Sequence, residues 1–122
     1  MTPKAWADLQ GQIVQDRARH DWTAKHTDWA TAWAVPRHEG RVAEYDDLLD
    51  GMDRIVRSMS LVSGWAEFRA GVKRDWRLWY GQAGACEPER NAGAQVKHAY
   101  GRAAACSEVL AYMDSAEKEA SR

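Results

Sequence analysis

Apolar residues recur along most of this chain at intervals of three and four, which is the spacing of one face of an α-helix. The clearest row lies before residue 60 and contains Val42, Tyr45, Leu49, Met52, Val56 and Met59. A similar row near the C-terminus contains Val96, Ala99, Ala103, Cys106, Leu110 and Met113. No run of β-branched residues alternates with polar ones, as strands would require. The pattern therefore predicts an all-α protein with four helices.

The beginning of the chain also predicts a helix. Thr2 followed by Pro3 is a good helix start, because a hydroxyl can cap the first turn and proline loses no hydrogen bond there. We expect helical structure from Pro3 towards Val35, where Pro36 stops it.

The apolar residues of this first region fall on two faces. One face holds Trp6, Leu9, Ile13 and His20. The nearly opposite face holds Trp22, Trp29 and Trp33. Either the helix breaks near Asp21, or one long helix buries different faces at its two ends.

A third helix is expected to start near Ser63 and Gly64 and to end at the glycines before Pro88. Its apolar row is bulky and contains Trp65, Phe68, Val72, Trp76 and Trp79. The fourth helix, reaching about Lys118, carries small residues at its centre. Since protein interiors pack densely, large side chains need small ones opposite. We predict that Trp65, Trp76 and Trp79 pack over Ala99, Ala103 and Cys106.

The two halves of the chain, residues 3–59 and 60–119, resemble each other. Trp6-Ala7-Asp8-Leu9 corresponds to Trp65-Ala66-Glu67-Phe68 at one constant offset. At a second offset, Gly40-Arg41 and Met52-Asp53 correspond to Gly101-Arg102 and Met113-Asp114. A shared helical period alone produces some likeness, but it does not require these particular pairs. We predict a single domain, 1–122, built from a duplicated helical hairpin.

Composition narrows the possible functions. At 122 residues the chain fits one domain, and its net charge of −1 creates no overall field that would attract nucleic acid or a membrane surface. No apolar run is long enough to span a membrane, and the N-terminus has no signal-peptide pattern. We therefore expect a cytoplasmic protein, or a virion component if a phage encodes it.

Candidate chemistry is sparse. Cys86 and Cys106 match neither a disulfide framework nor a zinc pattern, and Cys106 is expected to be buried. The four histidines are scattered: His20, His26, His38 and His98. No arrangement typical of a nucleophilic catalyst or a phosphate-binding loop is present. The sequence predicts no enzyme activity and no cofactor.

Acidic residues concentrate between residues 39 and 53. Glu44 and Asp47 have the spacing of one magnesium-binding pair in all-α nucleotide pyrophosphohydrolases, but the second pair is missing, so we expect no metal site. Asp46, Asp50 and Asp53 lie opposite the apolar row and predict a solvent-facing acidic face.

Basic residues occupy the polar side of the third helix: Arg69, Lys73, Arg74 and Arg77. Because like charges at this spacing repel, we expect acidic residues of the second helix to neutralise them. With Arg17, Arg19 and Lys25 they could instead form a phosphate-facing patch.

The aromatic row of Trp22, Trp29 and Trp33, with His26 between them, is the strongest candidate for a partner interface. It can pack under a bend of its own chain or against another chain, because tryptophan is a preferred anchor at interfaces. The leading interpretation is a non-enzymatic structural protein that assembles with itself or with a partner protein.

In size, helical hairpins and plain chemistry, the chain resembles the small virion-assembly proteins of tailed bacteriophages and prophages, such as connector, neck or capsid-associated subunits. The resemblance implies a homo-oligomer or a component of a larger assembly. Two alternatives stay open. One is an inhibitor that presents Asp46, Asp50 and Asp53 to a nucleic-acid-processing enzyme, and the other is a nucleic-acid-binding adaptor that uses the basic face.

Overall fold

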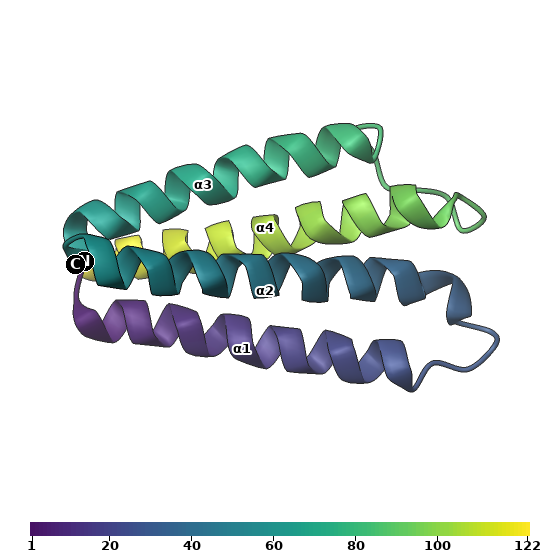
Figure 1. Cartoon of the computed structure of the whole chain (residues 1–122), viewed down its shortest axis with the longest axis horizontal. Coiled ribbons are helices and arrows are strands. Elements are labelled where there is room, and N and C mark those ends of the chain that lie inside the picture. The colour runs from purple at the N-terminus through teal and green to yellow at the C-terminus, as the bar shows by residue number, and fades with distance from the viewer.

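The computed structural model describes residues 1–122 and contains four α-helices and no strand (Figure 1). The helices are α1 (Pro3–Lys25), α2 (Val35–Ser58), α3 (Leu61–Gln82) and α4 (Ala94–Ala120), and a short 3-10 turn, η1 (Ala32–Ala34), leads into α2. The predicted all-α, four-helix arrangement is therefore confirmed. No helix is long and apolar enough to cross a membrane.

Hydroxyl caps start two of the helices. The Thr2 hydroxyl accepts a hydrogen bond from the Ala5 N–H at 3.1 Å, as expected for α1. Ser60 does the same for α3, accepting from the Ser63 N–H at 3.4 Å. Helix α3 therefore begins at Leu61, slightly before the predicted start.

The predicted end of the first helix was wrong. Helix α1 stops at Lys25, and Asp21 lies inside it. The Thr27 hydroxyl donates to the carbonyl of Thr23 at 3.2 Å, which occupies one of the unpaired acceptors in the last turn. Pro36 does not stop α1 but stands in the first turn of α2, where its missing N–H costs nothing.

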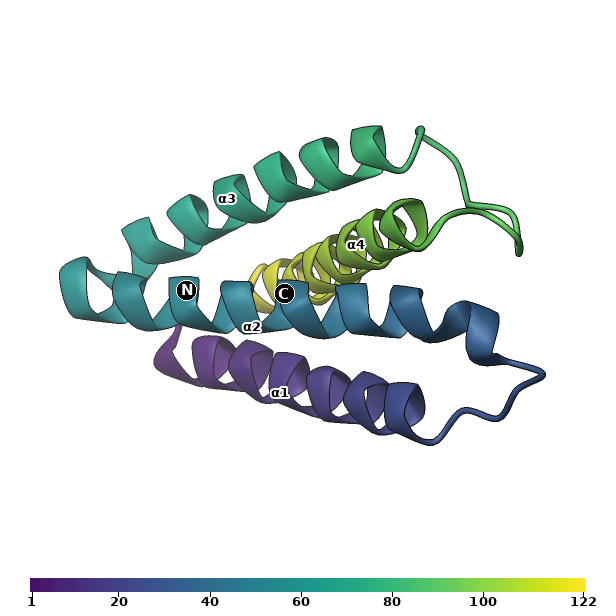
Figure 2. The same cartoon turned by 45° about the vertical axis from the view of Figure 1, so that its right-hand side comes forward.

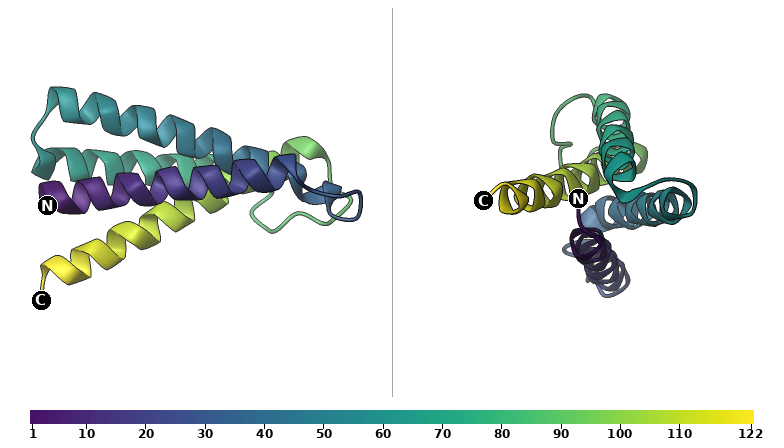
Figure 3. Two further views of the ribbon diagram at one scale, coloured as in Figure 1. Left: turned by 90° about the horizontal axis from the view of Figure 1, so that it is seen from below. Right: turned by 90° about the vertical axis from the view of Figure 1, so that its left-hand side faces the viewer.

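Helices α2 and α4 form the central pair and make the most extensive contact in the molecule. Helix α1 packs against α2 and α3 packs against α4, on opposite sides of that pair (Figures 1 and 3). Both termini lie at the end where α2 turns into α3, and the α1–α2 and α3–α4 loops lie at the other end (Figure 1). Towards its C-terminus α4 diverges from α1 (Figures 2 and 3).

The core is one apolar cluster drawn from all four helices. It contains Trp6, Leu9, Ile13, Tyr45, Leu48, Met52, Trp65, Phe68, Val72, Ala105, Cys106, Val109 and Met113. The α2 row was partly mispredicted, since Val56 is 52% exposed and Met59 is 40% exposed. Leu48 is buried, whereas Leu49 only packs against the edge of the core. The buried arc shifts because α2 contacts α1 on one side and α4 on the other.

Two glycines let the central helices touch backbone to backbone. A Cβ on Gly40 would lie 2.1 Å from the His98 carbonyl oxygen, and one on Gly101 would lie 2.1 Å from the Arg37 carbonyl oxygen. The contact is reciprocal, because a glycine of α2 lies against a backbone carbonyl of α4 and a glycine of α4 lies against a backbone carbonyl of α2. No other residue type fits at either position without moving a helix.

Ion pairs across the central pair repeat the same exchange. Arg41 of α2 pairs with Glu108 of α4 at 3.5 Å. Arg102 of α4, which corresponds to Arg41, pairs with Asp47 of α2, which corresponds to Glu108. These reciprocal contacts are the ones that a duplicated hairpin would produce, and the duplication itself stays a prediction.

The tryptophans of α3 do not pack as one block over the small residues of α4. Trp65 lies against Trp6 of α1, with ring centroids 6.4 Å apart. Trp79 covers the Arg102 guanidinium at 4.4 Å, and Trp76 stacks on Tyr80 at 5.1 Å. The prediction was wrong for Trp65 because α3 and α4 run antiparallel, which places its turn beside the C-terminal half of α4 (Figure 1).

Candidate functional site

The predicted aromatic interface does not form one helical face. Trp22 belongs to the last turns of α1, Trp29 to the loop that follows, and Trp33 to η1. Trp22 is 61% exposed and stacks on His26 with ring centroids 4.3 Å apart. The His26 ring also hydrogen-bonds the Trp22 carbonyl through Nδ1 at 2.8 Å, so the pair is held in one geometry.

Trp29 is 91% exposed, the highest value of any large apolar side chain in the molecule. Its loop is nevertheless tied down. The Asp28 carboxylate accepts from both the N–H and the hydroxyl of Thr31 at 3.1 Å. Arg90, from the α3–α4 loop, donates to the Ala30 carbonyl at 3.1 Å. The indole therefore projects into solvent from a braced loop.

Trp33 points the other way and belongs to the fold. Three cations lie over its ring: Arg90 at 5.0 Å, Arg37 at 5.4 Å and Lys97 at 5.9 Å from the centroid. Such contacts bind the two loops at this end of the bundle together. Of the four predicted interface residues, Trp22, His26 and Trp29 face solvent and Trp33 does not.

The acidic face is interrupted at its first member. Asp46 accepts from Arg17 of α1 at 2.7 Å, so it serves α1–α2 packing. Asp50 and Asp53 are exposed and have no ion-pair partner. Only two carboxylates of the predicted row are available to a partner.

The basic face is divided in the same way. Arg69 reaches Asp114 at 2.5 Å and Glu117 at 2.8 Å, both on α4 rather than on α2 as expected. Lys73, Arg74 and Arg77 are exposed and have no ion-pair partner.

A buried polar cluster that the sequence did not reveal lies between α2, α3 and α4. Glu44 is fully buried, and its Oε1 accepts from Arg102 at 3.0 Å. Its Oε2 has no donor and faces Asp75 of α3. Burial, together with the neighbouring Asp75 carboxyl, raises the pKa of Glu44 to about 8. Glu44 thus keeps a proton at neutral pH, and that proton can bridge to Asp75.

The magnesium-pair residues Glu44 and Asp47 therefore meet an arginine instead of a metal pair. The Arg102 guanidinium lies between the two side chains and bonds both Glu44 and Asp47. No three His, Cys, Asp or Glu side chains are grouped so that they could hold a metal ion. Beside the cluster, burial raises the pKa of the Cys106 thiol, so it stays a neutral packed side chain, while Cys86 is exposed.

Two of the histidines that look scattered in sequence meet across α1 and α2. The Nδ1 atoms of His20 and His38 are 2.8 Å apart, and Arg41 approaches His20 Nε2 at 3.4 Å. Because arginine only donates, His20 must carry its proton on Nδ1 and donate to His38. Burial, then Arg41 and His38, lower the pKa of His20 to about 4. The pair is neutral at physiological pH.

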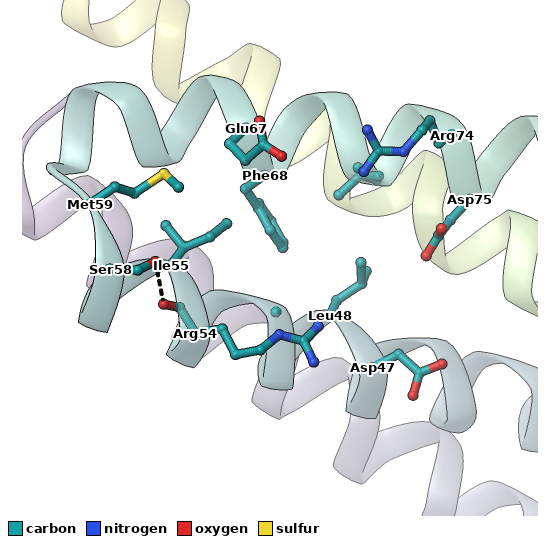
Figure 4. Close-up of a pocket in the computed structure, with 13 residues that line it drawn as sticks. Asp47, Leu48, Arg54, Ile55, Ser58, Met59, Glu67, Phe68, Arg74 and Asp75 are labelled. Carbon is teal, nitrogen blue, oxygen red and sulfur yellow. Dashed lines mark hydrogen bonds between the residues drawn. The ribbon is translucent and has the colours of Figure 1, made fainter.

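A groove of about 330 Å³ runs between α2 and α3 (Figure 4). Leu48, Phe68 and Val72 form its apolar floor, with Phe68 and Leu48 pointing towards one another (Figure 4). Arg54 of α2 and Arg74 of α3 stand on opposite walls, and neither has an ion-pair partner. Asp47 and Asp75 line the end nearest the buried polar cluster. The remaining lining residues are Gly51, Ile55, Ser58, Met59, Glu67 and Gly71.

The corresponding groove between α1 and α4 ends differently. Tyr112 lines it and donates its hydroxyl to Asp16 at 2.5 Å. Asp16 is only 4% exposed and does not reach the groove. By the offsets seen in the sequence, Asp16 corresponds to Asp75 and Tyr112 to Gly51. One aspartate is thus covered by a phenol, while the other lines an open groove.

Comparison with protein-family models, with curated proteins and with solved structures finds no match for this chain.

Proposed function

We propose that this chain is a non-enzymatic assembly protein whose copies bind one another through an aromatic patch, which consists of Trp22, His26 and Trp29. The observation that carries this proposal is Trp29, an indole 91% exposed on a loop held by hydrogen bonds. An ordered, exposed tryptophan is typical of an interface anchor, since its large apolar area is gained for little conformational entropy.

The patch has the composition expected of an interface centre. Trp22 and Trp29 supply apolar area, and the exposed imidazole of His26 supplies a polar edge. Neither Trp22 nor Trp29 belongs to the apolar core, so the packing of the core does not require these two side chains. Trp33 supports the patch from behind by fixing the loop through Arg90.

The resemblance to small virion-assembly proteins of tailed bacteriophages suggests what kind of assembly this chain would form. The assembly would be a symmetric ring or shell in which the patch at the loop end of one subunit contacts its neighbour. Of the two alternatives, the acidic face has lost Asp46 to Arg17 and the basic face has lost Arg69 to α4, so neither presents its full row.

Light scattering across a concentration series, at low and high salt, tests the proposal. We expect a discrete oligomer that persists at high salt, because the contact is apolar. Replacing Trp22 and Trp29 together with alanine should weaken assembly by at least about 30-fold, the effect of losing about 2 kcal/mol at an interface anchor.

The matched control is Val62→Ala, an exposed apolar side chain at the start of α3, at the other end of the bundle. This variant should assemble like the wild type, and circular dichroism should give the same helix content for all three proteins. A wild-type protein that stays monomeric at every concentration, or a double variant that assembles unchanged, contradicts the proposal.

A further inference from the structure

The groove between α1 and α4 corresponds to the groove between α2 and α3, so the two can be compared. The groove between α1 and α4 has a volume of about 400 Å³, and there the phenol of Tyr112 covers Asp16 and donates its hydroxyl to the carboxylate. Next to Asp75 the corresponding position is Gly51, and on the opposite wall Gln12 is replaced by Gly71. The second groove therefore has no phenol at the position that corresponds to Tyr112.

The two arginines of the open groove fold back over these glycines. A Cβ on Gly51 would lie 3.9 Å from an Arg54 guanidinium nitrogen, and one on Gly71 would lie 3.6 Å from an Arg74 guanidinium nitrogen. Neither arginine has a carboxylate within ion-pair distance, although acidic residues line the same groove (Figure 4). Guanidinium groups bind carboxylates and phosphates well, because their N–H donors match the geometry of two oxygen atoms.

We propose that the groove between α2 and α3 binds a small phenolic anion. The ring lies over the small exposed edges of Leu48 and Phe68, the hydroxyl donates to Asp75, and the anionic group binds between Arg54 and Arg74. The ligand supplies to Asp75 what Tyr112 supplies to Asp16. A volume of about 330 Å³ accommodates a single substituted ring. This site is separate from the aromatic patch and does not depend on self-assembly.

The buried end of the groove fits a donor better than an acceptor. Asp75 already faces Glu44, which carries a proton at neutral pH, and Asp47 is bonded to Arg102. The remaining lone pairs of Asp75 can accept a hydroxyl proton, whereas a second anion there would be repelled. The polarity of the groove therefore orients the ligand with its hydroxyl inward and its charge outward.

Nuclear magnetic resonance titration of the full-length, isotope-labelled protein with 4-hydroxyphenylacetate tests this proposal. Two matched probes accompany it: phenylacetate, which lacks the hydroxyl, and 4-hydroxyphenylacetamide, which lacks the charge. We expect amide shifts confined to residues 47–59 and 67–75 and a dissociation constant of about 1 mM or lower. Each matched probe should bind about 10-fold more weakly.

Two variants separate the groove from other surfaces. Gly51→Tyr places a phenol at the position that corresponds to Tyr112 and should abolish the shifts. Replacing Arg54 and Arg74 together with glutamine should make the acid and the amide bind equally. The control, Arg57→Gln, removes an exposed charge of α2 that does not line the groove and should change nothing.

Shifts that fall elsewhere, a Gly51→Tyr variant that binds like the wild type, or equal binding of all three probes would overturn the proposal. If circular dichroism finds the tyrosine variant unfolded, the arginine double variant decides. Loss of the preference for the acid supports the site, and an unchanged preference rejects it.

Discussion

The groove between α2 and α3 and the groove between α1 and α4 are built from corresponding helices but differ in what lies next to their aspartates. Each lies between an outer helix and the central helix of the other hairpin, and each outer helix carries an aspartate near its middle, Asp16 in α1 and Asp75 in α3. In one groove Tyr112 covers Asp16, and in the other Gly51 leaves Asp75 open to a volume of about 330 Å³. One frame can therefore hold a structural contact on one side and a candidate binding site on the other.

The buried titratable groups differ between the two sides as well. The α1 side has the His20–His38 pair, whose pKa values are lowered, and the α3 side has Glu44, whose pKa is raised. Opposite pKa shifts thus keep the two histidines and Glu44 uncharged at neutral pH. Protons destabilise the first side, and loss of a proton destabilises the second.

The largest effect is expected at the contact between the central helices α2 and α4, on which both grooves depend. Gly40→Ala and Gly101→Ala would each place a methyl group 2.1 Å from a carbonyl oxygen of the partner helix, so each should cost at least about 3 kcal/mol in urea unfolding. Gly11→Ala, with nothing within 4 Å, should instead stabilise by up to about 1 kcal/mol. Tolerance of alanine at only one of the central glycines would disprove the reciprocity.

Tyr112→Phe removes the hydroxyl that distinguishes the covered aspartate. Asp16 is buried and would keep only Arg19, at 3.1 Å, so unfolding should become easier by about 2 kcal/mol. The control is Tyr80→Phe, because the Tyr80 ring stacks on Trp76 but the Tyr80 hydroxyl makes no hydrogen bond. Equal stability of the two variants would mean that Tyr112 acts only through its ring.

Glu44→Gln should flatten the pH dependence on the α3 side. The raised pKa of Glu44 stabilises the fold below the ordinary value of 4.5, and this contribution is lost as the pH rises through about 8. Since one pKa unit corresponds to about 1.4 kcal/mol, the wild type should lose up to about 3.5 kcal/mol between pH 5 and 8 that the variant keeps, because glutamine is neutral throughout. Thermal unfolding at each pH measures this, with Asp50→Asn as the exposed control. A variant with the wild-type slope would show that Glu44 is ionised.

His20→Asn addresses the smallest effect, on the α1 side. The lowered pKa of His20 means that the unfolded chain takes up a proton first, so stability is complete above pH 6.5 and falls towards pH 4. The half-exposed ring reduces the size of this loss to about 1 kcal/mol or less. His26→Asn, which changes an exposed histidine outside this pair, should keep the acid slope that His20→Asn removes. Retention of the slope in both variants would assign it to other groups.

The sequence by itself determined the helices and most of the buried row of α4. Ala99, Ala103, Cys106 and Met113 are buried as their spacing predicted. The same reasoning went wrong at Pro36, because proline in a first turn and proline after a last turn look alike without the intervening loop. It also went wrong at Val56 and Met59, since periodicity assigns a face to every turn, including a terminal turn that no neighbour covers.

Only the tertiary structure decided which polar residues meet. Glu44 and Asp75, or His20 and His38, come from different helices, and no periodicity within one helix relates them. The separation of Trp29 from Trp33 depends likewise on where the α1–α2 loop turns and which cations gather on the Trp33 ring. A helix period specifies which side of a helix is apolar, whereas the neighbour on that side is set by packing of the whole chain.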